Sequence, residues 1–163
     1  MIRNSIAAVV AQLESAPKFL YGTANELNLL ADVQDWTNGV VMLYNLKPVT
    51  LEYTESYSIE SRYSIYMEFL YLTQFDEYTS QNEDICTKAY WLMKEFMIKL
   101  SQYREVPDDH KFFDIKVGDK NTSVPVYNKL DVNSTGVNLS MTLSKMGAHG
   151  FDPNSRPPGY VGP

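Results

Sequence analysis

The sequence predicts an α+β fold, in which an antiparallel sheet with a long β-hairpin packs against one long α-helix and one N-terminal α-helix. Residues 57–75 alternate between apolar and polar side chains, and so do residues 137–144. A period of two is typical of a strand. Residues 80–104 instead keep the helical spacing of apolar residues. The apolar face of the first alternating segment carries Tyr57, Ile59, Tyr63, Ile65, Met67, Phe69, Tyr71 and Phe75.

The N-terminal segment has the pattern of an amphipathic helix that ends before Pro17, because proline cannot continue a helix. We expect residues 19–36 to be mostly irregular. A short strand could begin at 19–21, and 26–31 could form a helical turn or an extended connection. The stripe of the N-terminal helix consists of Ile2, Ile6, Val9, Val10 and Leu13.

Residues 40–53 and 57–75 predict the two arms of an extended antiparallel hairpin. The first arm is interrupted near Pro48, because proline cannot donate to a strand ladder. The second arm would span roughly 60 Å if unbroken, whereas ordinary strands contain about five or six residues. It therefore either bends at a bulge or projects beyond its own domain. A projecting arm offers backbone hydrogen bonds to a neighbouring chain, so assembly is the first function to weigh.

A long helix is predicted to begin at Ser80, because Ser80 and Glu83 have the spacing of a capping box. Apolar residues keep the helical period from there to Tyr103. We expect this helix to pack across one face of the sheet, with Cys86 and Trp91 near its margins.

Short strands are predicted at 112–117 and from 124 to 127, before the half-buried strand at 137–144. We expect residues 1–145 to form a single domain. Residues 146–163 are rich in glycine and proline and are predicted to be a flexible tail. This segment is either a solvated end or a docking element, and its large side chains suited to docking are Phe151, Arg156 and Tyr160.

Composition favours a soluble globular chain. One domain is the natural interpretation of 163 residues, because a chain of about 150 residues buries roughly 70% of its unfolded surface. A net charge of −6 argues against a nucleic-acid-binding surface. No apolar run approaches the roughly 18–20 residues of a membrane span, no signal peptide is recognisable, and the lone Cys86 excludes an intrachain disulfide. The 12 tyrosines suit either interfaces or amphipathic strands.

The sequence predicts no catalytic, cofactor-binding or metal-ligating residue, and therefore no enzyme and no cofactor. His110 and His149 lack a second cluster of ligands. Residues Asp131–Gly136 begin like a calcium-binding loop, but Thr142 replaces the glutamate at its twelfth position, so a turn or bulge is favoured. Cys86 is interpreted as a buried structural thiol. Nucleotide-binding, hydrolase and metalloprotease motifs are absent.

The order of helix, strand hairpin, helix and strand pair resembles the tail-completion family of tailed bacteriophages, which includes tail terminators and related head–tail joining proteins. The helix at 80–104, with its core YWLMKEFMIKL, is similar to the single large helix of that fold. The segment VYNKLDVNSTGVNLSMTL, residues 126–143, is similar to its closing strand. The resemblance covers roughly residues 1–145 and leaves the Gly/Pro-rich tail outside.

This resemblance implies a structural virion protein, made in the host cytoplasm, that forms a homo-oligomeric ring at the head–tail junction or the top of the tail. The ring would be six-fold or twelve-fold and would contact tail-tube or connector (portal-side) proteins, with no membrane. DNA would pass through without specific binding, because an acidic inner face repels phosphates. The residues expected at interfaces are Tyr57, Tyr63, Tyr66, Tyr71, Phe151, Arg156 and Tyr160.

Two other classes of function stay open at this point. One is a non-viral α+β protein-binding module, and the other is a small enzyme whose site is scattered beyond sequence recognition. The size of the purified protein separates them from a ring former, which should run as a large multiple of 18.6 kDa.

Overall fold

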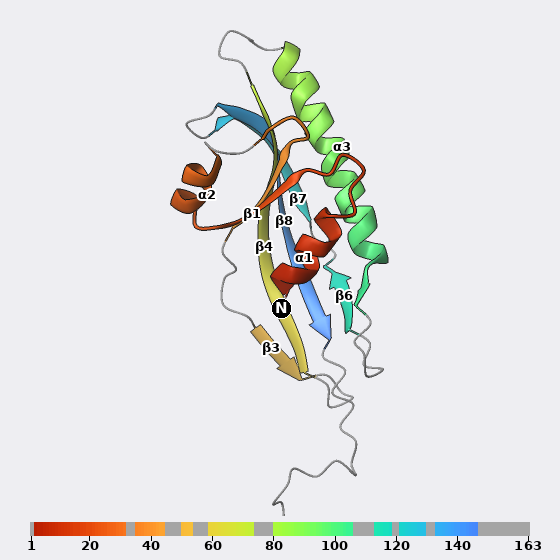
Figure 1. Cartoon of the computed structure of the whole chain (residues 1–163). Coiled ribbons are helices and arrows are strands. Elements are labelled where there is room, and N and C mark those ends of the chain that lie inside the picture. The colour runs from red at the N-terminus through yellow and green to blue at the C-terminus, as the bar shows by residue number, and fades with distance from the viewer. Residues whose placement is uncertain are drawn as a thin grey trace, which may run out of the picture.

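A computed structural model describes residues 2–31, 35–44, 50–53, 59–73, 80–105, 113–118, 121–129 and 133–146. Within these ranges the chain has an α+β fold, as predicted (Figure 1). Its helices are α1 (Ile2–Val10), α2 (Ala24–Ala31) and α3 (Ser80–Gln102). Its strands are β1 (Lys18–Gly22), β2 (Val40–Tyr44), β3 (Thr50–Tyr53), β4 (Ile59–Leu72), β5 (Arg104–Glu105), β6 (Phe113–Val117), β7 (Thr122–Lys129) and β8 (Ser134–Met146).

The strands follow the order β1-β2-β4-β8-β6-β5, with β3 paired to β4 and β7 paired to β8. The sheet is mixed, so the prediction of an antiparallel sheet is wrong at one edge, where β1 runs parallel to β2. A parallel pair needs a crossover connection, and α2 provides it. The prediction that residues 19–36 are mostly irregular is therefore also wrong, since β1 and α2 occupy much of that segment.

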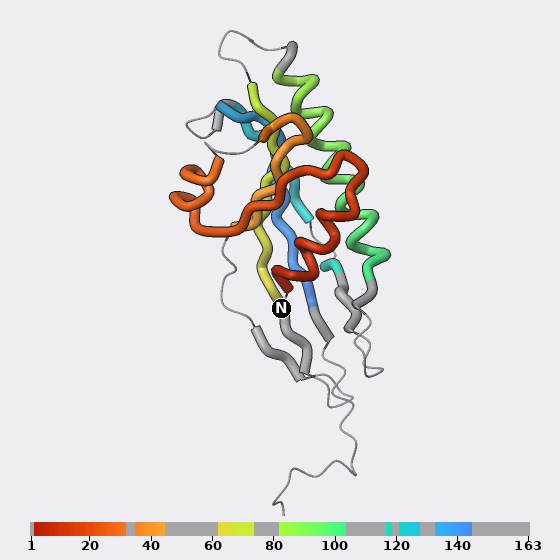
Figure 2. Tube along the Cα trace, viewed as in Figure 1, coloured from red at the N-terminus to blue at the C-terminus, as the bar shows by residue number. Residues whose placement is uncertain are grey.

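Helices α1 and α3 lie side by side on one face of the sheet, and α2 lies on the other (Figures 1 and 2). The alternation predicted for the long strand is confirmed over its described side chains. Its odd-numbered residues face α1 and α3, whereas Leu70 packs with Leu27 of α2. The odd-numbered residues in the core of α1 and α3 are Tyr63, Ile65, Met67, Phe69 and Tyr71.

Strand β2 has the sequence VVMLY, a continuous apolar run. Val41 and Leu43 pack with α1 and α3, whereas Val40 and Met42 pack in the cluster with α2. A strand that is covered on both faces has no polar side, so it does not alternate. Residues 40–43 of β2 are therefore all buried.

Strand β4 lies inside the sheet. Strand β8 pairs with it from Glu60 to Leu72, and β2 and β3 pair along its other side. The expectation that this strand projects to offer its backbone to a neighbour is therefore wrong for the residues that are paired on both sides, 60–62 and 67–70. The connections at 45–49 and 54–58 lie outside the described residues, so one continuous hairpin stays a prediction.

The closing strand β8 approaches β4 very closely at Gly136. A Cβ atom added there would lie 1.9 Å from the carbonyl oxygen of Phe69, so only glycine fits at this position. Just before β8, Asn133 adopts a left-handed conformation with φ of 52°. Its side-chain amide donates to the carbonyl oxygen of Thr73 at 3.1 Å. This contact joins residues 60 apart in the sequence, and Asp131 and Val132 lie outside the described residues, so the interpretation of the calcium-like segment as a local turn or bulge stays a prediction.

Candidate functional site

Three regions of the described structure gather chemically distinctive side chains. They are a cavity at the start of β2, a buried carboxylate between β2 and β8, and an aromatic surface formed by α3 and β7. Among the described residues, no three potential ligands of the His, Cys, Asp or Glu type lie together in a way that could hold a metal ion. Nor is any helix in these ranges long and apolar enough to cross a membrane. His110 and His149 lie outside the described residues.

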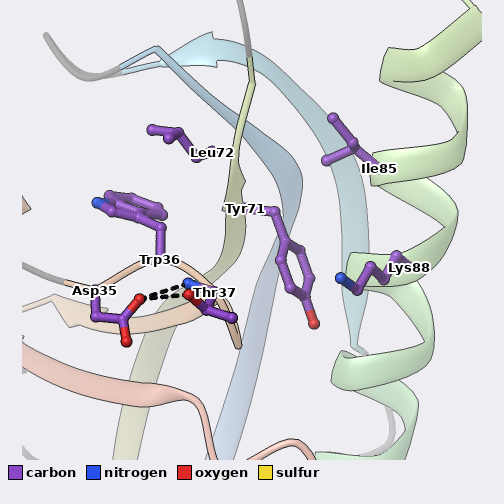
Figure 3. A pocket seen from close by; sticks show the side chains of 7 residues that line it. All are labelled: Asp35, Trp36, Thr37, Tyr71, Leu72, Ile85 and Lys88. Atoms are coloured by element: carbon purple, nitrogen blue, oxygen red, sulfur yellow. Dashed lines mark hydrogen bonds between the residues drawn. The ribbon is translucent and has the colours of Figure 1, made fainter.

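The cavity has a volume of about 500 Å³ and is drawn in Figure 3. The carboxylate of Asp35 accepts hydrogen bonds from the hydroxyl and the backbone N–H of Thr37, at 2.6 and 3.0 Å. These two bonds lower the pKa of Asp35. On the opposite wall, the Lys88 ammonium lies 4.2 Å from the centre of the Tyr71 ring. Each charged group is thus engaged by its own neighbour, and the two do not converge on one point in the cavity.

The buried carboxylate belongs to Glu68, which is fully inaccessible to solvent. It accepts a hydrogen bond from the hydroxyl of Tyr44 at 2.6 Å and another from the hydroxyl of Tyr66 at 2.9 Å. The two tyrosine rings meet edge to face, with centroids 5.0 Å apart. The side-chain amide of Asn138 donates to the Tyr66 hydroxyl, and its oxygen accepts from the backbone N–H of Val124. This network joins β2, β4, β8 and β7.

The electrostatics of this network hold both tyrosines in their neutral, donating form. Burial, followed by the charge of Glu68 and the hydrogen bond to it, raises the pKa of Tyr66 to about 12. Burial also raises the pKa of Tyr44, and the bond to Glu68 adds to the rise. A buried carboxylate is tolerated where donors satisfy it. The carboxylate of Glu68 is therefore the shared hydrogen-bond acceptor on the face of the sheet that carries α2.

The aromatic surface consists of Tyr90 and Trp91 on α3 and Tyr127 on β7. Trp91 is 61% exposed and faces away from the core, while Ala89 and Leu92 beside it are buried. The rings of Tyr90 and Trp91 meet edge to face with centroids 6.2 Å apart. Large apolar side chains in a cluster on a surface mark interaction sites more often than isolated ones do. We therefore take this region as the best candidate site.

A groove of about 340 Å³ runs between the first half of α3 and β7, beside the aromatic surface. Strand β7 pairs only with β8 among the described strands and carries Pro125, which edge strands tolerate because its missing N–H breaks no ladder. The groove is lined by Cys86, Thr87, Tyr90, Ser123, Pro125 and Val137.

The thiol of Cys86 is a fixed part of the groove. Its Sγ donates to the carbonyl oxygen of Gly136 at 3.3 Å, and the side chain is buried, as the sequence predicted. Burial raises the pKa of this thiol, while a hydrogen bond from Tyr127 opposes the rise. The neighbouring Cys86 is the main cause of the raised pKa of Tyr127, and the negative charge of Glu83, one turn earlier on α3, adds a smaller rise to the pKa of both Tyr127 and Cys86. An acidic group thus lies near one end of the groove.

The structure does not bring the predicted interface residues together. Tyr71 is only 7% exposed and lies in the core, and Tyr63 packs against the same core. Tyr66 points to the opposite face, where it binds Glu68. The remaining residues of that set lie outside the described ranges, namely Tyr57, Phe151, Arg156 and Tyr160.

Sequence reasoning missed Tyr90 and Tyr127 and placed Trp91 only at the margin of its helix. One signal for Trp91 was present, because Trp91 and Ile98 are two turns apart and fall outside the buried stripe of α3. Comparison with models of protein families finds no match, and comparison with curated proteins finds none either.

Proposed function

We propose that this chain is a structural virion protein that forms a homo-oligomeric ring at the head–tail junction or the top of a phage tail. The observation that supports an assembly role is the aromatic surface of Tyr90, Trp91 and Tyr127 beside the edge strand β7. Tyrosine and tryptophan combine large apolar area with few rotatable bonds, so they lose little entropy on binding and are enriched in interfaces. The choice of a phage ring over other assemblies rests on the resemblance in the order of elements.

The sheet supplies a second feature that suits a ring. Its order ends in β1 on one side and in β7, β6 and β5 on the other, so the two edges are formed by different strands. A contact between unlike surfaces of identical chains is heterologous, and repeated heterologous contacts close into rings when the rotation permits. The net charge of −6 would keep DNA phosphates from binding to such a ring.

Negative-stain imaging of the purified protein, together with native mass spectrometry, tests this proposal. The expected result is a ring of six or twelve copies, with a mass that is a multiple of 18.6 kDa. The same measurement after mixing with a tail-tube or connector protein covers the case in which the ring forms only on its partner. A chain that stays monomeric in both experiments would overturn the proposal.

A further inference from the structure

We infer that the groove between α3 and β7 receives residues 153–160 of a neighbouring copy, the proline-rich segment PNSRPPGY that follows β8 in the sequence. This inference rests on the proposed ring, because it names the contact that joins one subunit to the next. It commits the groove to one occupant, a second copy of this chain. Shape, charge and reach each support that choice.

The walls of the groove match a proline-rich ligand. Tyr90 comes from α3, Pro125 comes from β7, and Tyr127 lies beside them on the same strand. Aromatic-lined grooves bind proline-rich segments in the polyproline II conformation, because flat proline rings pack on aromatic faces. Such segments lose little conformational entropy on binding. A groove volume of about 340 Å³ lies at the lower end of the range that holds compact ligands.

The spacing of the segment fits the same walls. Polyproline II has three residues per turn and rises about 3.1 Å per residue. Pro157 and Tyr160 are three residues apart, so in that conformation they would project from the same side. One can pack in the groove while the other reaches the exposed ring of Trp91.

Charge complementarity fixes the direction of the segment. Glu83 is exposed and precedes the groove-lining Cys86 and Thr87 by three and four residues on α3, so it lies on the same side of the helix at one end of the groove. Arg156 directly precedes the proline pair of the segment. A guanidinium paired with the Glu83 carboxylate would hold the segment with its arginine toward the first turn of α3. Asp84, which is also exposed in that turn, adds to the negative field.

The reach of the chain favours a neighbouring copy over the same copy. The segment follows Met146, at the end of β8 that pairs with Glu60, whereas the groove lies at Val137 on the same strand. These positions are nine residues apart, which is about 30 Å along a strand. Residues 147–155 of the same copy would have to run back fully extended to place Arg156 in the groove. A neighbouring copy has no such constraint, and a contact between groove and tail is heterologous, as a ring requires.

A mixing experiment with two full-length variants tests the inference. The groove variant carries Tyr90→Ala and Tyr127→Ala, both at exposed positions. The tail variant carries Arg156→Ala, Pro157→Ala, Pro158→Ala and Tyr160→Ala. Each variant alone is expected to be monomeric, and an equimolar mixture is expected to form a heterodimer of one intact groove and one intact tail, measured by native mass spectrometry. Leu29→Ala, which removes another exposed apolar side chain, on α2, is the matched control and should assemble fully.

A charge exchange checks the predicted ion pair independently of packing. Glu83→Arg and Arg156→Glu should each weaken assembly by about tenfold, and the double variant should restore it. A peptide of residues 149–163 should bind the tail variant saturably and should bind about tenfold more weakly once Tyr127→Ala is added.

The outcomes separate the two proposals. Rings that form normally in both the groove and the tail variant would overturn this inference and leave the proposed ring intact. A mixture that yields no heterodimer, although the peptide binds, would show that a tail attached to its own subunit does not reach the groove of another, and would overturn the choice of a neighbouring copy. A wild-type chain that stays monomeric alone and with tail partners would instead overturn the proposed function itself.

Discussion

Strand β4 lies inside the sheet, with β8 along one side and β2 and β3 along the other, whereas β7 lies at the edge and pairs only with β8 among the described strands. From Ile65 to Tyr71, every side chain of β4 except that of the half-buried Tyr66 is buried, whereas Thr122 to Pro125 of β7 are all exposed. The sequence predicted a role in assembly for β4 because its alternating segment is much longer than an ordinary strand. Its interior position instead gives it a role in stability, and the short edge strand carries the surface available to a partner.

The largest effect should come from the interior of β4. Phe69 is fully buried and its ring lies 5.5 Å from that of Phe96. Phe69→Ala removes the packing between the sheet and α3, so it should lower the free energy of unfolding by about 3–5 kcal/mol. Urea denaturation followed by circular dichroism measures this value. On β7, the exposed Val124→Ala should change it by less than about 0.5 kcal/mol, and equal losses at the two positions would erase the contrast between the strands.

The second effect concerns the polar side of β4. Glu68→Ala removes the acceptor that the hydroxyls of the half-buried Tyr44 and Tyr66 share, and each hydrogen bond to a charged group contributes about 1.5–3 kcal/mol. We expect a loss in unfolding free energy near the middle of the range for such sites, about 2–4 kcal/mol. Glu68→Gln keeps an acceptor oxygen and should lose less. If the two substitutions cost the same in urea denaturation, neither the retained side-chain volume nor the retained acceptor oxygen stabilises the fold, and the shared hydrogen-bond acceptor would not be the source of the loss.

The contrast between the strands also explains how far the sequence predicts the fold. Periodicity predicts α1, α3, β4 and β8 with nearly correct bounds, because each buries one continuous face against the core. It fails at β1 and α2, whose short segments bury only a few residues. A local signal was present there, since Thr23 and Glu26 form the same type of capping box as that predicted for α3.

The candidate site is harder to predict, because it depends on which strands are neighbours. Glu68 meets Tyr44 only because β2 and β4 pair in a particular register, and Asn138 lies directly opposite Glu68 only through the pairing of β4 with β8. Tyr127 lies at an edge because no described strand covers β7 on its outer side. Pairings between distant segments are not encoded in the local pattern, so the sequence does not show that Tyr66 meets Glu68 or that Tyr127 lies on an edge strand.

The pH dependence of stability should also distinguish the interior strand β4, which carries Tyr66, from the edge strand β7. The pKa of Tyr66 is raised to about 12 from an ordinary value of 10.0. A raised folded-state pKa means that the stabilisation is fully present below the unfolded value and is lost as pH rises through the folded value. Stability should therefore decline between about pH 10 and 12, and the decline should be smaller in Tyr66→Phe. Ultraviolet absorbance of tyrosinate should show a late-titrating group that this substitution removes.

A small effect on stability should accompany a large effect on assembly at Trp91. Trp91 is exposed and its ring lies 4.8 Å from the Lys94 ammonium, so Trp91→Ala should change the free energy of unfolding by less than about 1 kcal/mol. Because the same ring belongs to the aromatic surface, its loss should weaken self-association by about tenfold or more, measured by analytical ultracentrifugation. Leu29→Ala on α2 should alter neither quantity. If Trp91→Ala destabilised the fold as much as Phe69→Ala does, the aromatic surface would be part of the core, and the separation between a stabilising interior strand and an assembling edge would be lost.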